Sequence, residues 1–120
     1  MWDGAITEHS GFVAVPVSLL KLQAKFGLSA VDMLVLINLL GYRWAKDAPV
    51  FPRNSIIATR MGITERTVQR TMSKLLRLRL VERSKDEKGL RVYKLENLVR
   101  RVAELTPSVE RIADAFNDDV

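Results

Sequence analysis

The chain has 120 residues, a length typical of one domain with a modest hydrophobic core. Its content of 48% hydrophobic and 28% charged residues excludes a wholly disordered chain, and the absence of cysteine excludes disulfides and thiolate metal sites. The longest apolar run, residues 33–40, contains Asn38 and is too short to cross a bilayer.

The net charge of +5 is concentrated in one part of the chain. Residues 1–52 are neutral overall, and residues 96–120 have a net charge of −3. Residues 53–95 carry twelve basic and four acidic side chains, which gives a net charge of +8. Such a basic block favours a polyanionic partner, of which nucleic acid is the common example.

The N-terminal segment predicts a tail followed by a first helix. Residues 1–11 are expected to form a flexible tail, and they show neither the basic start nor the apolar core of a secretory signal. We therefore expect a cytoplasmic, nucleoid-associated protein. Ser18 is the expected N-cap of a helix over residues 19–26, which Gly27 ends.

A second helix is predicted over residues 30–43. Ser29 followed by Asp32 three residues later is typical of a capping box. Apolar residues then occupy more than one face, which indicates the central helix of the core; they are Val31, Leu34, Val35, Leu36, Ile37, Leu39 and Leu40. The aspartate and prolines of residues 47–52 predict a loop.

The basic block begins with two short helices and a turn. Asn54 is the expected N-cap of a third helix over residues 54–60, and Gly62 has the position of a left-handed turn residue. Thr64 is the expected N-cap of a fourth helix, over residues 64–78. Its apolar side recurs at helical spacing in Val68, Thr71, Met72, Leu75, Leu76 and Leu78.

A β-hairpin is predicted next. Residues 80–84 and 90–95 are short β-like runs, and they flank the polar turn of residues 85–89. Two helices joined by a tight glycine turn and followed by a hairpin are the parts of a winged helix-turn-helix. The predicted fold class is therefore mainly α with a small β-hairpin, comprising a tail at 1–11, a winged helix-turn-helix domain at 12–96 and a helical C-terminal extension at 97–120.

The stretch FPRNSIIATRMGITERTVQRTMSKLLRLRLVERS, residues 51–84, resembles the winged helix-turn-helix domains of bacterial, plasmid and phage regulators and replication initiators. The resemblance covers roughly residues 12–99. The chain departs from the usual pattern at Arg53, where a serine commonly caps the third helix, and at Arg79, where a glycine often ends the recognition helix. The resemblance implies that the fourth helix reads the major groove of DNA.

Candidate DNA contacts follow from this geometry. Glu65, Arg66, Gln69 and Arg70 are the expected base readers, because the N-terminal part of a recognition helix reaches the base edges. The remaining candidates are expected to meet phosphate or to line the interface: Arg53, Asn54, Ser55, Thr64, Thr67, Ser73, Lys74, Arg77, Arg83, Lys85, Lys88 and Arg91. Thr64 and Glu65 also have a structural interpretation, as a cap and as a favourable charge at a helix N-terminus.

The C-terminal segment shows a heptad seam, interrupted at Pro107. The seam consists of Leu98, Val102, Leu105, Val109, Ile112 and Phe116. We expect it to form a homodimer interface, since a small helix-turn-helix commonly needs two copies for specificity. Two alternatives stay open: the seam packs on its own domain, or the segment leads into a further domain.

The most direct functional interpretation is sequence-specific binding of double-stranded DNA by a transcriptional regulator. The alternative is a DNA-binding module of a plasmid or phage replication initiator, and a third is a protein-interaction winged helix. We expect no enzyme, cofactor, metal, membrane or small-molecule ligand, because the sequence shows no catalytic or phosphate-loop motif. The aromatic residues are predicted to belong to the core and not to a single-strand stacking surface; they include Phe26, Tyr42, Trp44, Phe51 and Tyr93.

Overall fold

The computed structural model describes residues 3–4, 11–43, 53–85, 87–89 and 91–118. For residues 42, 43 and 109–118 it describes the backbone alone. Most of the predicted tail at 1–11 and the predicted loop at 47–52 lie outside the described residues, as do Trp44 and Phe51.

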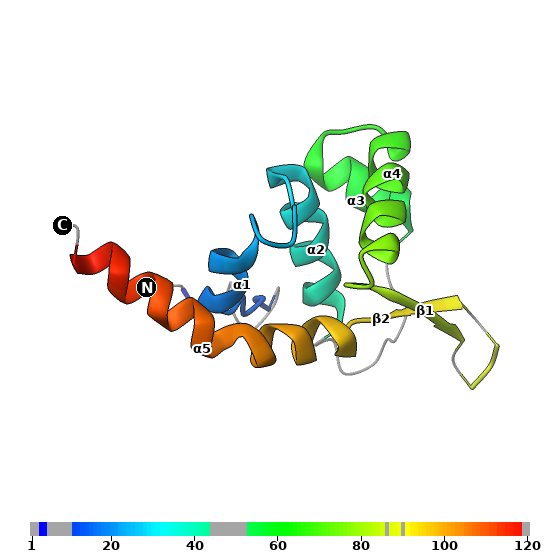
Figure 1. Cartoon of the computed structure of the whole chain (residues 1–120). Helices are drawn as coiled ribbons and strands as arrows, with labels where there is room; N and C mark the ends of the chain where they lie inside the picture. Colours follow the sequence, from blue (N-terminus) through cyan, green and yellow to red (C-terminus); the bar gives the residue numbers. More distant parts are fainter. Residues whose placement is uncertain (1–2, 5–10, 44–52, 86, 90, 119–120) are drawn as a thin grey trace.

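The described chain is mainly helical with one two-stranded antiparallel hairpin, which confirms the predicted fold class. Its elements are α1 (Val17–Leu22), α2 (Ala30–Arg43), α3 (Asn54–Met61), α4 (Glu65–Arg77), β1 (Glu82–Lys85), β2 (Arg91–Lys94) and α5 (Glu96–Asp118). In Figure 1, α2 lies in the centre, with α3 and α4 on one side, α1 on the other, and α5 running beneath α1 and α2. The hairpin projects away from the helices beyond the end of α4 (Figure 1).

The start of α2 has the predicted capping box. The amide of Ser29 donates to Asp32 Oδ2 at 2.8 Å, and the amide of Asp32 donates to Ser29 Oγ at 3.1 Å. These two bonds satisfy backbone donors that a helix start leaves without intrahelical partners. Asp32 is buried, so the box also fixes a carboxylate inside the domain.

The predicted caps of α1 and α3 were wrong. Ser18 lies inside α1, because Pro16 has the extended backbone of the N-cap and its ring fixes φ at a compatible value. The N-cap of α3 is Arg53, and Asn54 is its first helical residue. Neither cap makes a side-chain hydrogen bond.

The first helix is also shorter than predicted. It ends at Leu22, and a turn leads from there to Gly27, whose φ of +73° reverses the chain. The amide of Leu28 closes this turn by donating to the carbonyl of Gln23 at 2.9 Å.

A single core joins α2 to the helix-turn-helix. The central position of α2 is confirmed by its fully buried Val35, Leu36 and Leu39, although Leu34 is 51% exposed. The fourth helix contributes a stripe at helical spacing, made of Val68, Thr71, Met72 and Leu75. This stripe fixes which side of α4 faces outward.

The turn between α3 and α4 is the predicted glycine turn. Gly62 has a φ of +67°, a left-handed conformation that glycine adopts without steric cost. The amide of Ile63 donates to the carbonyl of Ala58 at 3.1 Å, and Ala58 is buried where α3 and α4 pack together. The small side chain of Ala58 allows this close packing.

The fifth helix runs unbroken through Pro107. Proline removes the amide that would bond to the carbonyl of Ala103, but Ala103 is exposed, so water can serve that carbonyl. Thr106 Oγ1 donates to the carbonyl of Val102 at 2.8 Å within the same turn.

The predicted dimer seam divides into two parts. Leu98 and Val102 are buried in the core of the same chain, and Leu105 packs against that core. This half therefore follows the alternative in which the seam packs on its own domain, because apolar groups already buried cannot also form a free interface. The side chains of Val109, Ile112 and Phe116 lie outside the description, so dimerisation through them stays a prediction.

The start of α5 holds the end of α4. Asn97 Nδ2 donates to the carbonyl of Arg79, and Arg101 Nη1 donates to the carbonyl of Leu78 at 2.7 Å. The guanidinium of Arg101 also lies 5.0 Å from the ring centroid of Phe26. These contacts satisfy backbone carbonyls just past the C-terminus of α4. They also place the charge of Arg101 at this end of the helix, where the helix dipole favours a cation.

We predict opposite effects of adding a methyl group at two glycines. Gly62→Ala should lower the free energy of unfolding by about 1 kcal/mol, because a side chain disfavours a positive φ. Gly41→Ala is the matched control, since Gly41 is helical and its new Cβ would meet only Val13 Cβ at 3.9 Å. It should raise the free energy by about 0.4–1 kcal/mol. Urea denaturation measures both, and equal effects would contradict the turn geometry.

Candidate nucleic-acid interface

The outward side of α4 is polar and basic. Glu65, Arg66, Gln69 and Arg70 are all exposed, opposite the buried stripe. A shallow groove runs along this side, here called the α4 groove; it is lined by Arg66, Gln69, Arg70, Ser73, Lys74 and Arg77. The helix therefore presents hydrogen-bonding groups along several turns, as a helix in a major groove must.

Two of the predicted contacts are occupied by capping. Thr64 has an extended backbone, and its Oγ1 accepts from the amide of Thr67 at 3.2 Å, which confirms the predicted cap. The hydroxyls of Thr64 and Thr67 also lie 2.9 Å apart and share a hydrogen bond. These hydroxyls fix the start of α4 and with it the position of the residues that are predicted to read bases.

Lys74 has a partner that sequence reasoning missed. Its Nζ lies 2.5 Å from Oδ2 of Asp32, the buried carboxylate of the α2 capping box. The pair joins α4 to the start of α2 across 42 residues of sequence. The positive charge of Lys74 is thus already compensated, and we expect it to contribute little to phosphate binding.

The environment of Asp32 acts on its pKa in two directions. Burial of the carboxyl raises its pKa, but hydrogen bonds from Lys74 and Ser29 and the charge of Lys74 lower it more. The net pKa lies below that of an ordinary aspartate. Asp32 is therefore ionised at neutral pH and holds α4 against α2.

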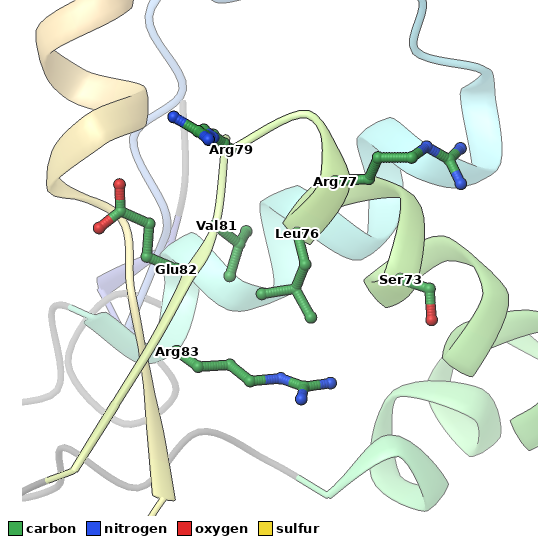
Figure 2. A pocket seen from close by; sticks show the side chains of 7 residues that line it. All are labelled: Ser73, Leu76, Arg77, Arg79, Val81, Glu82 and Arg83. Carbon is green, nitrogen blue, oxygen red and sulfur yellow. The ribbon is translucent and has the colours of Figure 1, made fainter.

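A cleft separates the C-terminal half of α4 from β1 (Figure 2). This α4–β1 cleft has a volume of about 630 Å³ and is lined by Ser73, Leu76, Arg77, Arg79, Val81, Glu82 and Arg83. Figure 2 shows Leu76 and Val81 pointing into its middle and Arg83 extending along its lower edge, while the side chains of Arg77 and Arg79 point away from it. The sequence already drew attention to Arg79 as a charge at the end of the fourth helix, although not as one of the expected DNA contacts. Glu82 was not expected here, because only the folded chain brings β1 beside α4.

Arg79 has an unusual backbone conformation. Its φ of +58° is the only positive value at a non-glycine position among the described residues. A side chain disfavours this left-handed conformation, so Arg79 is held there with local strain. This cation lies at the edge of the α4–β1 cleft.

A second cleft lies between the start of α3 and the hairpin. This wing cleft has a volume of about 650 Å³ and is lined by Arg53, Asn54, Arg83, Ser84, Lys85, Arg91, Val92 and Tyr93. Arg83 lines both clefts, so the basic surface continues from α4 to the wing. The structure thus brings together predicted contacts from α3, β1 and β2.

Other predicted contacts lie outside these three surfaces. Ser55 is half-buried in the first turn of α3, and Lys88 is exposed in the hairpin turn. Glu65 is exposed in the first turn of α4, where its charge favours the helix N-terminus. Their roles toward DNA stay predictions.

We predict that the contribution of Asp32 to stability depends on pH. Its pKa is lowered on folding, so the contribution is complete above the unfolded pKa of about 3.9 and is lost as the pH falls through the folded value. Asp32→Asn should lower the free energy of unfolding by about 1–2 kcal/mol at pH 7. This difference from the wild type should shrink below about pH 4.

The measurement is urea denaturation from pH 7 to pH 2.5. Glu104→Gln, which neutralises an exposed carboxyl on α5, is the control and should change stability little at any pH. A difference between wild type and Asp32→Asn that stays constant over this range would refute the role of the ion pair.

Comparison with known proteins identifies the family of this chain. The model of the DnaD N-terminal domain matches residues 15–112, which is most of the chain. No curated protein matches the chain. Within the described residues, no helix combines the length and apolarity that a membrane span requires. The match favours a replication-related, DNA-binding type of domain over the expected transcriptional regulator, so the replication alternative fits better. The chain belongs to the DnaD N-terminal domain family.

Proposed function

We propose that this chain is a DNA-binding module of the replication-initiation machinery, which places α4 in the major groove of duplex DNA and its wing on the flanking backbone. The observation that carries the proposal is the continuous basic surface formed by the α4 groove and the two clefts. Family membership supports the replication role.

The base-reading residues are those on the first turns of α4. Arg66 and Arg70 suit guanine, because a guanidinium binds its O6 and N7 together. Gln69 suits adenine, and Glu65 suits the amino group of cytosine. All four side chains are exposed, and the Thr64 cap fixes the helix start from which they project.

Phosphate contacts come from the ends of this surface. Arg77 lies in the last turn of α4, and Arg53 and Asn54 lie at the start of α3. On the wing, Arg83 and Arg91 are exposed and line the wing cleft. Such contacts fix the register of the protein on DNA and depend on salt more than on sequence.

Selection of bound sites from random duplexes, at two salt concentrations, tests the proposal. Directly repeated sites such as those of a replication origin support a replication module, whereas a palindrome supports the regulator. If no duplex is retained at low salt, the basic surface does not serve DNA and the winged helix binds a protein partner.

We predict that two cations in one helix differ in their contribution to DNA binding. Arg77→Gln should lower the slope of log K against log salt by about 0.9, because it removes one phosphate contact. The double variant Lys74→Met/Asp32→Asn, which removes the whole ion pair, should leave the slope nearly unchanged because Asp32 already compensates Lys74. Fluorescence anisotropy from 50 to 300 mM salt provides the slopes; equal losses in both variants would be evidence against this assignment.

A further inference from the structure

One face of the hairpin combines three cations with an aromatic ring. The antiparallel register pairs Arg83 with Tyr93 and Lys85 with Arg91. Side chains that pair directly lie on the same face, and residues two apart in a strand share that face. The four side chains therefore form one block, and all four residues line the wing cleft.

This block differs from the sequence expectation. Tyr93 was expected to be a core residue, and no aromatic was expected among basic residues. The structure leaves Tyr93 half-buried, packed on the core and lining the cleft at the same time. Its neighbours on this face are Arg83 across the ladder and Arg91 along the strand. An aromatic platform among cations is the arrangement that binds unpaired nucleotides.

The positive charges that line the wing cleft favour binding of an anion. Lys85 and Arg91 oppose each other directly in the ladder, and like charges in such a pair are destabilising. Arg53, at the start of α3, adds a fourth cation from the other side of the cleft. None of the described residues that line this cleft is acidic. A phosphodiester bound here relieves that repulsion.

The ring decides which form of nucleic acid suits the cleft. A duplex would use only the cations of the cleft, which bind its phosphates. It would not use the ring, because the faces of paired bases are covered by their neighbours in the stack. An unpaired base exposes its face, which stacks on an aromatic side chain. Asn54 also lines the cleft, and its side-chain carboxamide has both donors and an acceptor for a base edge.

We propose that the wing cleft holds an unpaired nucleotide of a strand that leaves a duplex bound to α4, with its base on Tyr93 and its phosphates on Arg53, Lys85 and Arg91. The proposal deepens the proposed function and rests on it. Arg83 supplies the connection, since it lines both this cleft and the α4–β1 cleft beside the helix. The domain would thus recognise a junction of duplex and single strand.

The test compares three DNAs with the full chain: a blunt duplex, the same duplex with one single-stranded arm, and the arm alone. The wild type should bind the forked DNA about tenfold more tightly than the blunt duplex, the size of one base–aromatic stack. Tyr93→Leu should abolish this preference and leave duplex affinity unchanged, whereas Tyr93→Phe should keep it. Thermal unfolding of each variant confirms that it is folded.

A second pair of variants tests the phosphate part without touching the ring. Arg91→Gln should weaken binding of the forked DNA more than binding of the blunt duplex. Lys94→Gln is the matched control, because Lys94 is exposed on the same strand and alternates to the other face of the hairpin. Equal effects of the two substitutions on the forked DNA would overturn the proposal.

The remaining outcomes separate this inference from the proposed function. If the blunt duplex binds with a steep salt dependence but the fork gains nothing, the junction proposal fails and the duplex function stands. If no DNA binds, both fail. If 1 mM dATP binds in a Tyr93-dependent manner while no fork preference exists, the cleft takes a free nucleotide and the strand assignment is wrong.

Discussion

The position of α4 depends on one buried carboxylate. Asp32 closes the capping box of α2 and, with the same side chain, accepts a hydrogen bond from Lys74 on α4. A charge in such surroundings is stable only when it is paired and hydrogen-bonded, so losing either partner affects both helices. The apolar stripe of α4 sets which side is buried, and this pair adds a directional contact at the rim of the core.

Further contacts hold both ends of the same helix. The glycine turn at Gly62 and the Thr64 cap fix its start. At the other end, Asn97 and Arg101 on α5 donate hydrogen bonds to the backbone carbonyls that follow the last turn of α4. The fifth helix therefore connects the end of α4 to the part of the core where α1 and α5 pack together. A helix held at both ends and in between can present its outward side chains to a rigid ligand with little loss of entropy on binding.

Local signals allowed much of this structure to be predicted. The capping box at Ser29, the glycine turn and the Thr64 cap depend on residues within a few positions of each other, and all three are confirmed. The predictions at Ser18 and Asn54 were wrong because a residue with an extended backbone preceded each of them and served as the cap.

The features missed by sequence reasoning depend on distant parts of the chain. In the sequence, Lys74 cannot be distinguished from any other surface cation. Its partner Asp32 is 42 residues away along the chain and meets it only in the folded protein. The block around Tyr93 depends on strand register, which places residues on one face that the sequence separates. Burial of Leu98 and Val102 likewise depends on where α5 docks, which a heptad pattern leaves open.

The most direct test of the central claim is an amide chemical-shift titration of the ¹⁵N-labelled chain with a short duplex at low salt. If the basic surface binds DNA, the shifted amides will lie in α4, in β1 and β2, and at the start of α3, while those of α1 stay unchanged. Shifts confined to α1 and α5, or none at all, would contradict the account.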